Sequence, residues 1–217
     1  MNSRIHTEKN FWDGYSGKYD KFMKRMDALY ADLIEEVRPV LKPEHRVIEL
    51  AAGTGLISLE LASFVKNVYA MDLSENMIRL ASSKAREQRI DSAYFVTGDA
   101  YDTAFADSCC DVCLLINALH VMKDPNKVLG EVSRILKPDG LFIAATFCHG
   151  QSFFTRTVSS IMSLAGFKAF QKFSIESCKQ FLIDGGFKIV EDKIFKDIIP
   201  LSYLVAMPGS NLYNLPK

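Results

Sequence analysis

The sequence has no excess of either charge and no long apolar run. Lys and Arg together number 26, as do Asp and Glu, so no overall field favours binding to nucleic acid. No apolar segment approaches the length that a membrane span requires. The first residues, MNSRIHTEKNFWDG, lack the apolar core of a signal peptide. We therefore expect a soluble, cytoplasmic protein that does not act on nucleic acid.

Metal-binding clusters are also scarce. The four histidines are scattered, and among the five cysteines Cys110 and Cys113 form a CxxC pair. This pair opens an apolar run typical of a buried strand, in which side chains three positions apart point to opposite faces. We therefore expect buried, reduced thiols and no metal site.

Apolar and polar segments alternate along most of the chain with short connections. This alternation predicts an α/β fold with a doubly wound, mostly parallel sheet and helices on both faces. The strands are expected at Val47–Leu50, Asn67–Met71, Ala93–Thr97, Val112–Ile116 and Leu141–Phe147, and the helices at Leu56–Val65, after Ser74, after Asp124-Pro125 and at Ser174–Asp184.

The last third departs from this alternation. Ser152–Ala165 has an apolar helical face and predicts a small helical insertion after the fifth strand. Phe187–Phe195 and Leu201–Met207 are rich in β-forming residues, and Pro200 separates them. We expect these two segments to form an antiparallel hairpin at one side of the sheet.

The stretch VIELAAGTGLIS, from Val47 to Ser58, has the form of a strand, a glycine turn and a helix. Small residues let a backbone approach a ligand closely, and the helix adds unpaired N–H groups. As a dinucleotide fingerprint it is weak, because Ser58 stands where the third glycine belongs. Glu49 disfavours a pyrophosphate and suits a ligand with positive charge; alternatively it caps a nearby backbone or pairs with a lysine.

The segment Glu49-Leu50-Ala51-Ala52-Gly53-Thr54-Gly55 resembles the first motif of the class I S-adenosylmethionine-dependent methyltransferases, in which an acid precedes a G-x-G-x-G turn. The likeness continues in chain order and is closest to the small-molecule and lipid-type members, of the methyltransferase domain 11 kind. The matching segments are Trp12 to Asp20, Asp72, Gly98-Asp99-Ala100, Asn117-Ala118-Leu119-His120, Leu136-Lys137-Pro138-Asp139-Gly140 and Phe181 to Phe187.

This resemblance implies a Rossmann-like sheet of seven strands, the last one antiparallel, and a methyltransferase that converts S-adenosylmethionine to S-adenosylhomocysteine. It implies that Asp72 binds the ribose hydroxyls and that Asp99 meets the adenine amino group. Ala51 replaces the first glycine of the turn, which is compatible if its backbone keeps an ordinary conformation. The implied cofactor-binding residues are Tyr15, Tyr19, Glu49, Ala51, Gly53, Gly55, Asp72, Leu73, Met77, Asp99, Ala100 and Asn117.

The whole chain is then expected to be one methyltransferase domain in four parts. The parts are a helical lid region at 1–42, a cofactor-binding core at 43–150, the helical insertion at 151–186 and the C-terminal hairpin at 187–217.

Methyl transfer requires alignment of the two reactants and exclusion of water, and a base only if the acceptor arrives protonated. His120 follows the fourth strand and is the candidate general base; a packing role is the equal alternative. His149 follows the fifth strand and either lines the acceptor pocket or lies on a surface loop, with the surface loop slightly favoured.

An N-terminal stripe gives the one hint about the acceptor. Its aromatic and Met residues recur at helical spacing, opposite a basic face. Packing of the stripe on the core is the plain interpretation; a lid over the cofactor, with the basic face meeting an anionic membrane, is the alternative. With the apolar insertion, this favours a small hydrophobic or amphipathic acceptor, such as a quinone-like ring or a lipid headgroup. The stripe comprises Trp12, Tyr15, Tyr19, Phe22 and Met26, and the basic face Lys18, Lys21, Lys24 and Arg25.

Two other functions stay open at this point. One is an NAD(P)-dependent oxidoreductase on a similar sheet, against which Glu49, Ser58 and the antiparallel ending argue. The other is a methyltransferase-like protein that binds without catalysing.

Overall fold

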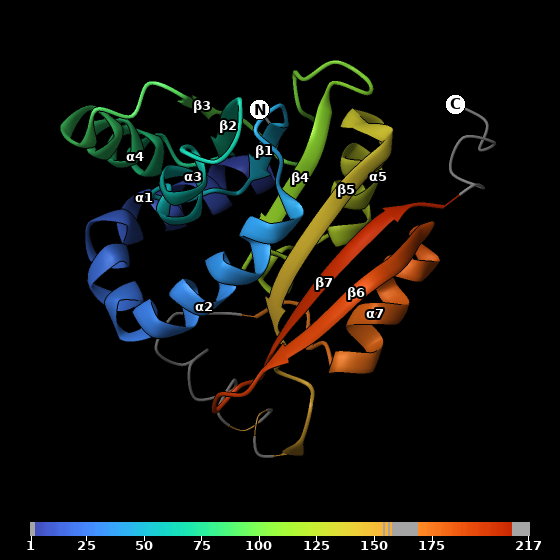
Figure 1. Ribbon diagram of the computed structural model, residues 1–217. Helices are drawn as coiled ribbons and strands as arrows, with labels where there is room; N and C mark the ends of the chain where they lie inside the picture. The colour runs from blue at the N-terminus through green and yellow to red at the C-terminus, as the bar shows by residue number, and fades with distance from the viewer. Residues whose placement is uncertain (1–2, 154, 156, 158–168, 210–217) are drawn as a thin grey trace.

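The computed structural model describes residues 3–153, 155, 157 and 169–209. Within this part of the chain, seven strands form one sheet in the order β3-β2-β1-β4-β5-β7-β6 (Figure 1). The first five strands are mutually parallel where they pair, and β7 is antiparallel to both of its neighbours. The predicted doubly wound, seven-stranded sheet with an antiparallel last strand is confirmed. The strands are β1 (Arg46–Leu50), β2 (Asn67–Asp72), β3 (Ala93–Thr97), β4 (Cys110–Ile116), β5 (Leu136–Phe147), β6 (Phe187–Phe195) and β7 (Leu201–Pro208).

Helices cover both faces of the sheet, as the alternation predicted. The core on one face joins the sheet to α5 and α7, and the core on the other joins it to α2 and α3. The central strand β4 supplies both cores: Leu115 packs into the first, and Leu114 and Ile116 pack into the second. The helices are α1 (Ser3–Met23), α2 (Asp27–Val37), α3 (Leu56–Leu61), α4 (Glu75–Gln88), α5 (Pro125–Ile135) and α7 (Ile175–Asp184).

Two predicted boundaries are wrong. Strand β5 begins at Leu136, five residues before the predicted start, because Leu136 pairs with Cys110 on β4. Helix α3 ends at Leu61 and not at Val65, because the chain tightens there and the Phe64 N–H donates to the Leu61 carbonyl three residues back.

The expectation that the two thiols of the CxxC pair, Cys110 and Cys113, point to opposite faces of the sheet is also wrong. The ladder between β4 and β5 shifts register between Cys110 and Val112, so strict alternation of side chains breaks at Asp111. Cys110 and Cys113 consequently lie in the same core cluster. Both are free, buried thiols.

The C-terminal hairpin of β6 and β7 joins the sheet through β7, which pairs with β5 over Phe142–Phe147. Where the two strands of the hairpin connect, the Cys148 N–H donates to the Pro200 carbonyl (2.7 Å). This bond ties the end of β5 to the start of β7 and fixes the segment that follows β5.

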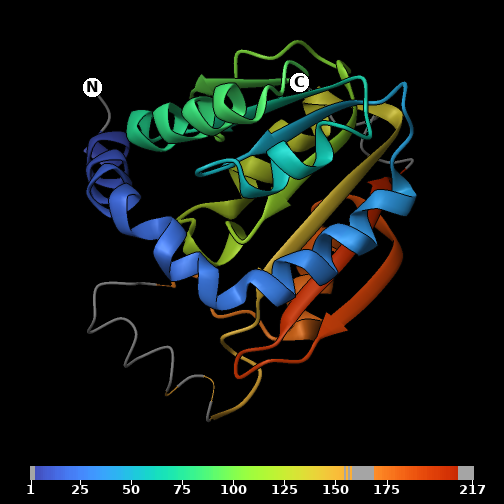
Figure 2. The ribbon, with the colours of Figure 1, turned by 60° about the vertical axis from the view of Figure 1, so that its left-hand side comes forward.

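The N-terminal helices α1 and α2 follow one another along one side of the molecule (Figure 2). Helix α1 packs against α4, whereas α2 packs over β5 and β7 through Leu33 and Val37. The predicted basic face is exposed throughout, at Lys18, Lys21, Lys24 and Arg25.

No helix in the described ranges is long and apolar enough to cross a membrane. Most of the helix predicted over Ser152–Ala165 lies outside the described residues, which leave out 154, 156 and 158–168. The division of the chain into four parts stays a prediction.

Candidate active site

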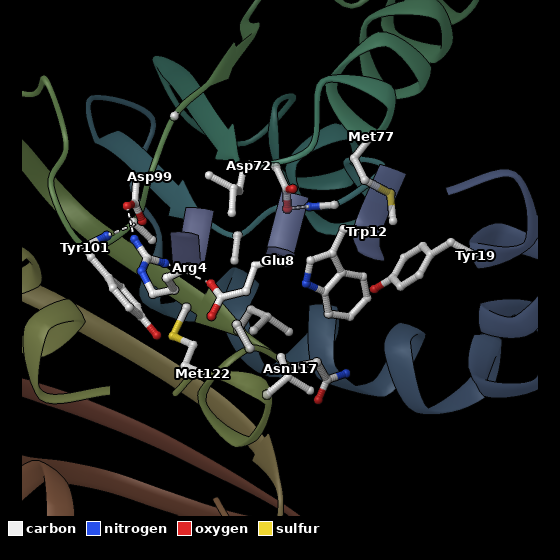
Figure 3. A pocket seen from close by; sticks show the side chains of 18 residues that line it. Arg4, Glu8, Trp12, Tyr19, Asp72, Met77, Asp99, Tyr101, Asn117 and Met122 are labelled. Carbon is white, nitrogen blue, oxygen red and sulfur yellow. Dashed lines mark hydrogen bonds and ion pairs between the residues drawn. The ribbon is translucent and has the colours of Figure 1, made fainter. Parts of the chain in front are cut away.

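Two cavities adjoin at the edge of the sheet where β1, β2 and β4 end. The first has a volume of about 100 Å³ and is lined by the segments that follow β1 to β4 and by side chains of α1 (Figure 3). Most of the predicted cofactor-binding residues line it: Tyr19, Ala51, Gly53, Asp72, Leu73, Met77, Asp99, Ala100 and Asn117. Tyr15 and the predicted base His120 line the second cavity instead.

The turn after β1 adopts the left-handed conformation three times. Gly53 (φ 56°) and Gly55 (φ 76°) suit this region, but Ala51 also lies in it at φ 55°. The expectation of an ordinary backbone at Ala51 is therefore wrong: alanine occupies a position that favours glycine. Gly55 lies beside neither cavity, and its role is steric, because a Cβ there would lie 2.8 Å from the Phe95 ring.

Asp72 lies at the end of β2 with its carboxylate in the first cavity. One oxygen accepts a hydrogen bond from the Gly53 N–H and the other from the Ser74 N–H, both at 2.8 Å. Burial raises the pKa of Asp72, and these two donors offset part of the effect. Each carboxylate oxygen keeps a second lone pair for a ligand.

Glu49 does not face the first cavity. Its side chain is 2% exposed and accepts a hydrogen bond from the Ser58 hydroxyl at the start of α3. It lines a void of about 10 Å³ together with Tyr19 and Tyr30. Burial raises the pKa of Glu49 to about 7. Among the described contacts, Glu49 accepts from both the hydroxyl and the backbone N–H of Ser58, so the alternative that it caps a nearby backbone is confirmed and the alternative of a lysine partner is wrong.

Asp99 meets a residue that the sequence interpretation missed. Figure 3 shows Arg4 of α1 beside Tyr101 and Glu8, pointing toward Asp99. The Arg4 guanidinium forms an ion pair with Asp99 and lies 4.1 Å from the centre of the Tyr101 ring. The signal for this was present, because Arg4, Glu8 and Trp12 are spaced four apart and share one helix face, which lines the cavity.

Two carboxylates hold α1 across the cavity. Asp13 accepts hydrogen bonds from the Ser74 hydroxyl (2.6 Å) and the Asn76 N–H (3.2 Å). Further along α1, Asp20 accepts from the Thr54 hydroxyl (2.5 Å) and pairs with Lys84 at 2.7 Å. The N-terminal helix is thus anchored to both the glycine turn and α4.

The second cavity is larger and mostly apolar. It has a volume of about 250 Å³ and shares Trp12, Tyr19 and Asn117 with the first. The predicted aromatic stripe of α1 therefore forms a wall of this cavity as well as packing on the protein. The remaining residues around it are Tyr15, Phe22, Met23, Met26, Tyr30, His120, Phe147, His149, Asp197, Ile198 and Ile199.

Two histidines face this second cavity. His120 is 1% exposed, and its Nδ1 lies 3.0 Å from the Thr146 hydroxyl. The His149 ring is centred 5.1 Å from that of His120 and is also 1% exposed, so the surface-loop interpretation of His149 is wrong. Burial lowers the pKa of His120 to about 3, with His149 adding to the effect, and lowers the pKa of His149 to about 4.

Comparison with known proteins gives matches over the same part of the chain. Residues 48–144 match the model of a methyltransferase domain. The UbiE ubiquinone/menaquinone biosynthesis C-methyltransferase of Acidiphilium cryptum is 32% identical, over 65% of this chain and 59% of its own. The demethylmenaquinone methyltransferase of Renibacterium salmoninarum is 36% identical, over 49% of this chain and 43% of its own. The chain thus spans about half the length of these curated relatives.

Among solved structures, the YcgJ protein of Bacillus subtilis superimposes with a TM-score of 0.72 at 16% identity. The match covers 82% of this chain and 98% of YcgJ, and it supports the fold alone. Together with the strand order, these similarities support a Rossmann-like fold of the methyltransferase kind, with residues 48–144 similar to a methyltransferase domain.

Proposed function

We propose that this protein transfers a methyl group from S-adenosylmethionine, bound in the first cavity, to a small hydrophobic or amphipathic acceptor in the second. One observation carries the proposal. A cavity with acidic side chains adjoins an apolar cavity, and the two share Trp12, Tyr19 and Asn117. Reactants bound in adjoining cavities meet at these shared residues.

The residues of the first cavity fit the cofactor. Asp72 and Asp99 supply carboxylates that accept hydrogen bonds from hydroxyl and amino groups. Gly53 brings its backbone to the edge of the cavity in a left-handed conformation (φ 56°) that glycine adopts without strain. When bound, the cofactor supplies a methyl group activated by a sulfonium.

The chain's own part is to bind, orient and exclude water. The aromatic side chains of α1 cover the acceptor cavity, and burial favours the close approach of reactants in a site with little water. Among the curated relatives, one is named for a quinone C-methyltransferase and another, from Pectobacterium atrosepticum, for a malonyl-[acyl-carrier protein] O-methyltransferase. A quinone-like ring or a lipid headgroup is the acceptor class that the apolar cavity favours.

We infer that His120 positions the acceptor and is a weak base. A general base works best with a pKa near the working pH, and the pKa of His120 is lowered to about 3. Replacement His120→Asn should therefore reduce kcat by less than the roughly 10²–10⁴ typical of a lost base. Steady-state rates across a pH series measure this, and a larger loss of kcat, together with loss of a titration in the rate profile, would restore the role of base.

Peripheral contact with an anionic membrane extends this proposal. The exposed basic face begins on α1 and continues into the short 3₁₀ helix Lys24–Met26 that follows it. The aromatic side chains that line the acceptor cavity come from this same part of the chain. Ile198, at the rim of that cavity, is 67% exposed. An exposed basic face together with an exposed apolar residue at the acceptor cavity suits an acceptor delivered from a lipid surface.

Fluorescence of Trp12 tests cofactor binding directly, since it is the single tryptophan and lines both cavities. S-Adenosylhomocysteine should change this emission with saturation, and NAD(H) should not. The Asp72→Ala variant should bind more weakly by about 1.5–3 kcal/mol, the cost of a lost charge-assisted hydrogen bond. A response to NAD(H) alone would replace the proposal with an oxidoreductase.

Transfer of labelled methyl to a panel of lipids, quinols and amines tests catalysis. Incorporation into an apolar acceptor is expected. Cofactor binding without turnover on any fraction would favour the non-catalytic alternative.

A further inference from the structure

His149 lines the second cavity, and hydrogen bonds hold the backbone on both sides of it. It directly follows Cys148, whose N–H donates to the Pro200 carbonyl, and precedes Gly150, whose N–H donates to the Phe173 carbonyl; both bonds are 2.7 Å. A Cβ at Gly150 would lie 2.1 Å from a backbone oxygen, so the segment is packed tightly. The backbone on either side of His149 is thus held in place, and this sets the position from which its side chain enters the cavity.

Both ring nitrogens of His149 are buried without a hydrogen-bond partner among the described residues. The side chain is 1% exposed, and its ring neighbours are His120 at 5.1 Å and Phe147 at 6.4 Å between centroids. A buried polar group with no partner costs roughly 1–3 kcal/mol, so such groups are normally paired. The ring lines the acceptor cavity, and a ligand there is the partner that the described protein does not supply.

The chemistry of that partner follows from the imidazole. Burial lowers the pKa of His149, and Lys172 adds to the effect, so the ring is neutral at pH 7, with one donor and one acceptor nitrogen. A hydroxyl both donates and accepts, and it can pair with whichever nitrogen faces the cavity. A carbonyl can only accept, and a charged ammonium would lose its hydration in the apolar surroundings.

The walls of the cavity specify the rest of the ligand. Rings line it on several sides, and aromatic side chains favour stacked or edge-on contact with another ring. An acceptor of an electrophilic methyl group must itself be electron-rich, which holds for a ring that carries a hydroxyl and not for its oxidised carbonyl form. The rings are those of Trp12, Tyr15, Tyr19, Phe22, Tyr30 and Phe147.

We propose that the second cavity selects an acceptor bearing a hydroxyl on an aromatic ring, and that His149 binds this hydroxyl. The inference rests on the proposed function for the identity of the acceptor site, but the binding itself requires no cofactor. His149 is thereby the residue that determines acceptor specificity.

Calorimetric titration of the full chain without cofactor tests the proposal. The probes are naphthol, methoxynaphthalene and naphthoquinone, which share the ring and differ in the polar group. The wild type should bind naphthol about tenfold more tightly than methoxynaphthalene, the equivalent of one hydrogen bond to a buried group. Naphthoquinone should bind no more tightly than methoxynaphthalene.

Three variants separate the hydrogen bond from packing. His149→Phe keeps a ring and should abolish the preference for naphthol while still binding methoxynaphthalene. His149→Gln restores a polar group and should recover part of the preference. Phe147→Leu, on the cavity wall, should weaken both probes by the same factor. Thermal melting establishes that each variant is folded, and if His149→Phe is not, His149→Leu takes its place in the comparison.

An unchanged preference in His149→Phe, tighter binding of naphthoquinone than naphthol by the wild type, or no binding of any probe would overturn the proposal. A preference that depends on His149 in a chain that does not bind S-adenosylhomocysteine would uphold the acceptor cavity and refute the proposed methyl transfer. The two failures are therefore distinguishable.

Discussion

At the scale of single residues, Glu49 and Ala51 stand two positions apart and are constrained in different ways. The Glu49 carboxyl is buried, and its hydrogen bond to Ser58 joins β1 to α3. Ala51 is constrained by its backbone, which adopts the left-handed conformation at φ 55°. Both therefore act on stability, and Ala51 also lines the cofactor cavity.

The Glu49 carboxyl should make stability depend on pH. Its pKa is raised from 4.5 to about 7, chiefly by burial, so the folded protein keeps a proton that the unfolded chain releases. Stability from this group is full below pH 4.5 and is lost as the pH rises to 7, by roughly 1–3 kcal/mol in all. Urea unfolding at a series of pH values should show this loss in the wild type and not in Glu49→Gln. Glu60→Gln, exposed on α3, is the control and should follow the wild type.

Ala51→Gly should stabilise the protein. A left-handed conformation costs a non-glycine residue about 1–2 kcal/mol, and the added freedom of glycine in the unfolded chain costs about 0.4–1 kcal/mol. The expected net gain therefore lies between zero and about 1.6 kcal/mol, measured by urea unfolding. Ala52→Gly next to it, outside the left-handed region, should destabilise; a loss of stability in both variants would contradict the strain at Ala51.

At the scale of elements, α1 decides the size of the first cavity. A site for a cofactor-sized ligand has a volume of about 300 Å³ or more, whereas this cavity has about 100 Å³. Arg4, Glu8 and Trp12 project into it from α1. The proposed cofactor therefore requires these side chains to move, and the ion pair of Arg4 with Asp99 opposes that movement.

Arg4→Ala should consequently bind S-adenosylhomocysteine more tightly, by about fivefold, because a partly exposed ion pair contributes roughly 1 kcal/mol. Trp12 fluorescence measures the affinity. The matched control is Arg25→Ala. It also removes one positive charge, but at an exposed position that does not line the cavity. Weaker binding by Arg4→Ala alone would mean that Arg4 contacts the ligand and does not compete with it.

The sheet was predictable from the sequence because its strands are apolar runs that end at turn residues. The start of β5 was not predictable, because the residues Lys137-Pro138-Asp139-Gly140 are typical of a turn. In the structure, pairing of Leu136 with Cys110 extends the strand through them. The same register shift defeated the prediction for the CxxC pair. The local sequence pattern of one strand does not show where its pairing with a neighbouring strand shifts register.

The sequence correctly places residues beside the first cavity where they lie at or just after the end of a strand, as Asp72, Asp99 and Asn117 do, while their role in binding a cofactor stays a prediction. Prediction failed for Arg4 and His149, whose contacts depend on how separate elements come together. Arg4 reaches the cavity only because Asp13 and Asp20 hold α1 in place, and His149 is buried because residues near Pro200 and Phe173 close over it. The spacing of Arg4, Glu8 and Trp12 places them on one helix face, but no local pattern in the sequence shows what that face, or His149, contacts.

At the scale of the whole molecule, the formal net charge is zero, but the charged side chains are unevenly distributed over the surface. The basic residues at Lys18, Lys21, Lys24 and Arg25 are all exposed, and they lie close in sequence to the aromatic residues that line the acceptor cavity. A local cluster of this kind attracts an anionic lipid surface, by about 1 kcal/mol per basic residue, without help from the total charge.

The proposed membrane contact should therefore depend on lipid charge. Sedimentation with phosphatidylglycerol-rich vesicles should retain the wild type, and pure phosphatidylcholine vesicles should not. The Lys21→Glu, Lys24→Glu double variant should lose binding, whereas Lys66→Glu, Lys188→Glu, away from the cavity rim, should keep it. Equal retention by both vesicle types would contradict an electrostatic contact.

The position of β7 between β5 and β6 has a consequence for the order of assembly. During synthesis β6 leaves the ribosome before β7, yet in the described sheet β6 pairs with β7 alone. Until Leu201–Pro208 has been made, β5 keeps an open edge and β6 has no strand to join. The two unpaired edges are then exposed together on a nascent chain, and the sheet closes in one late step in which a single strand seals both.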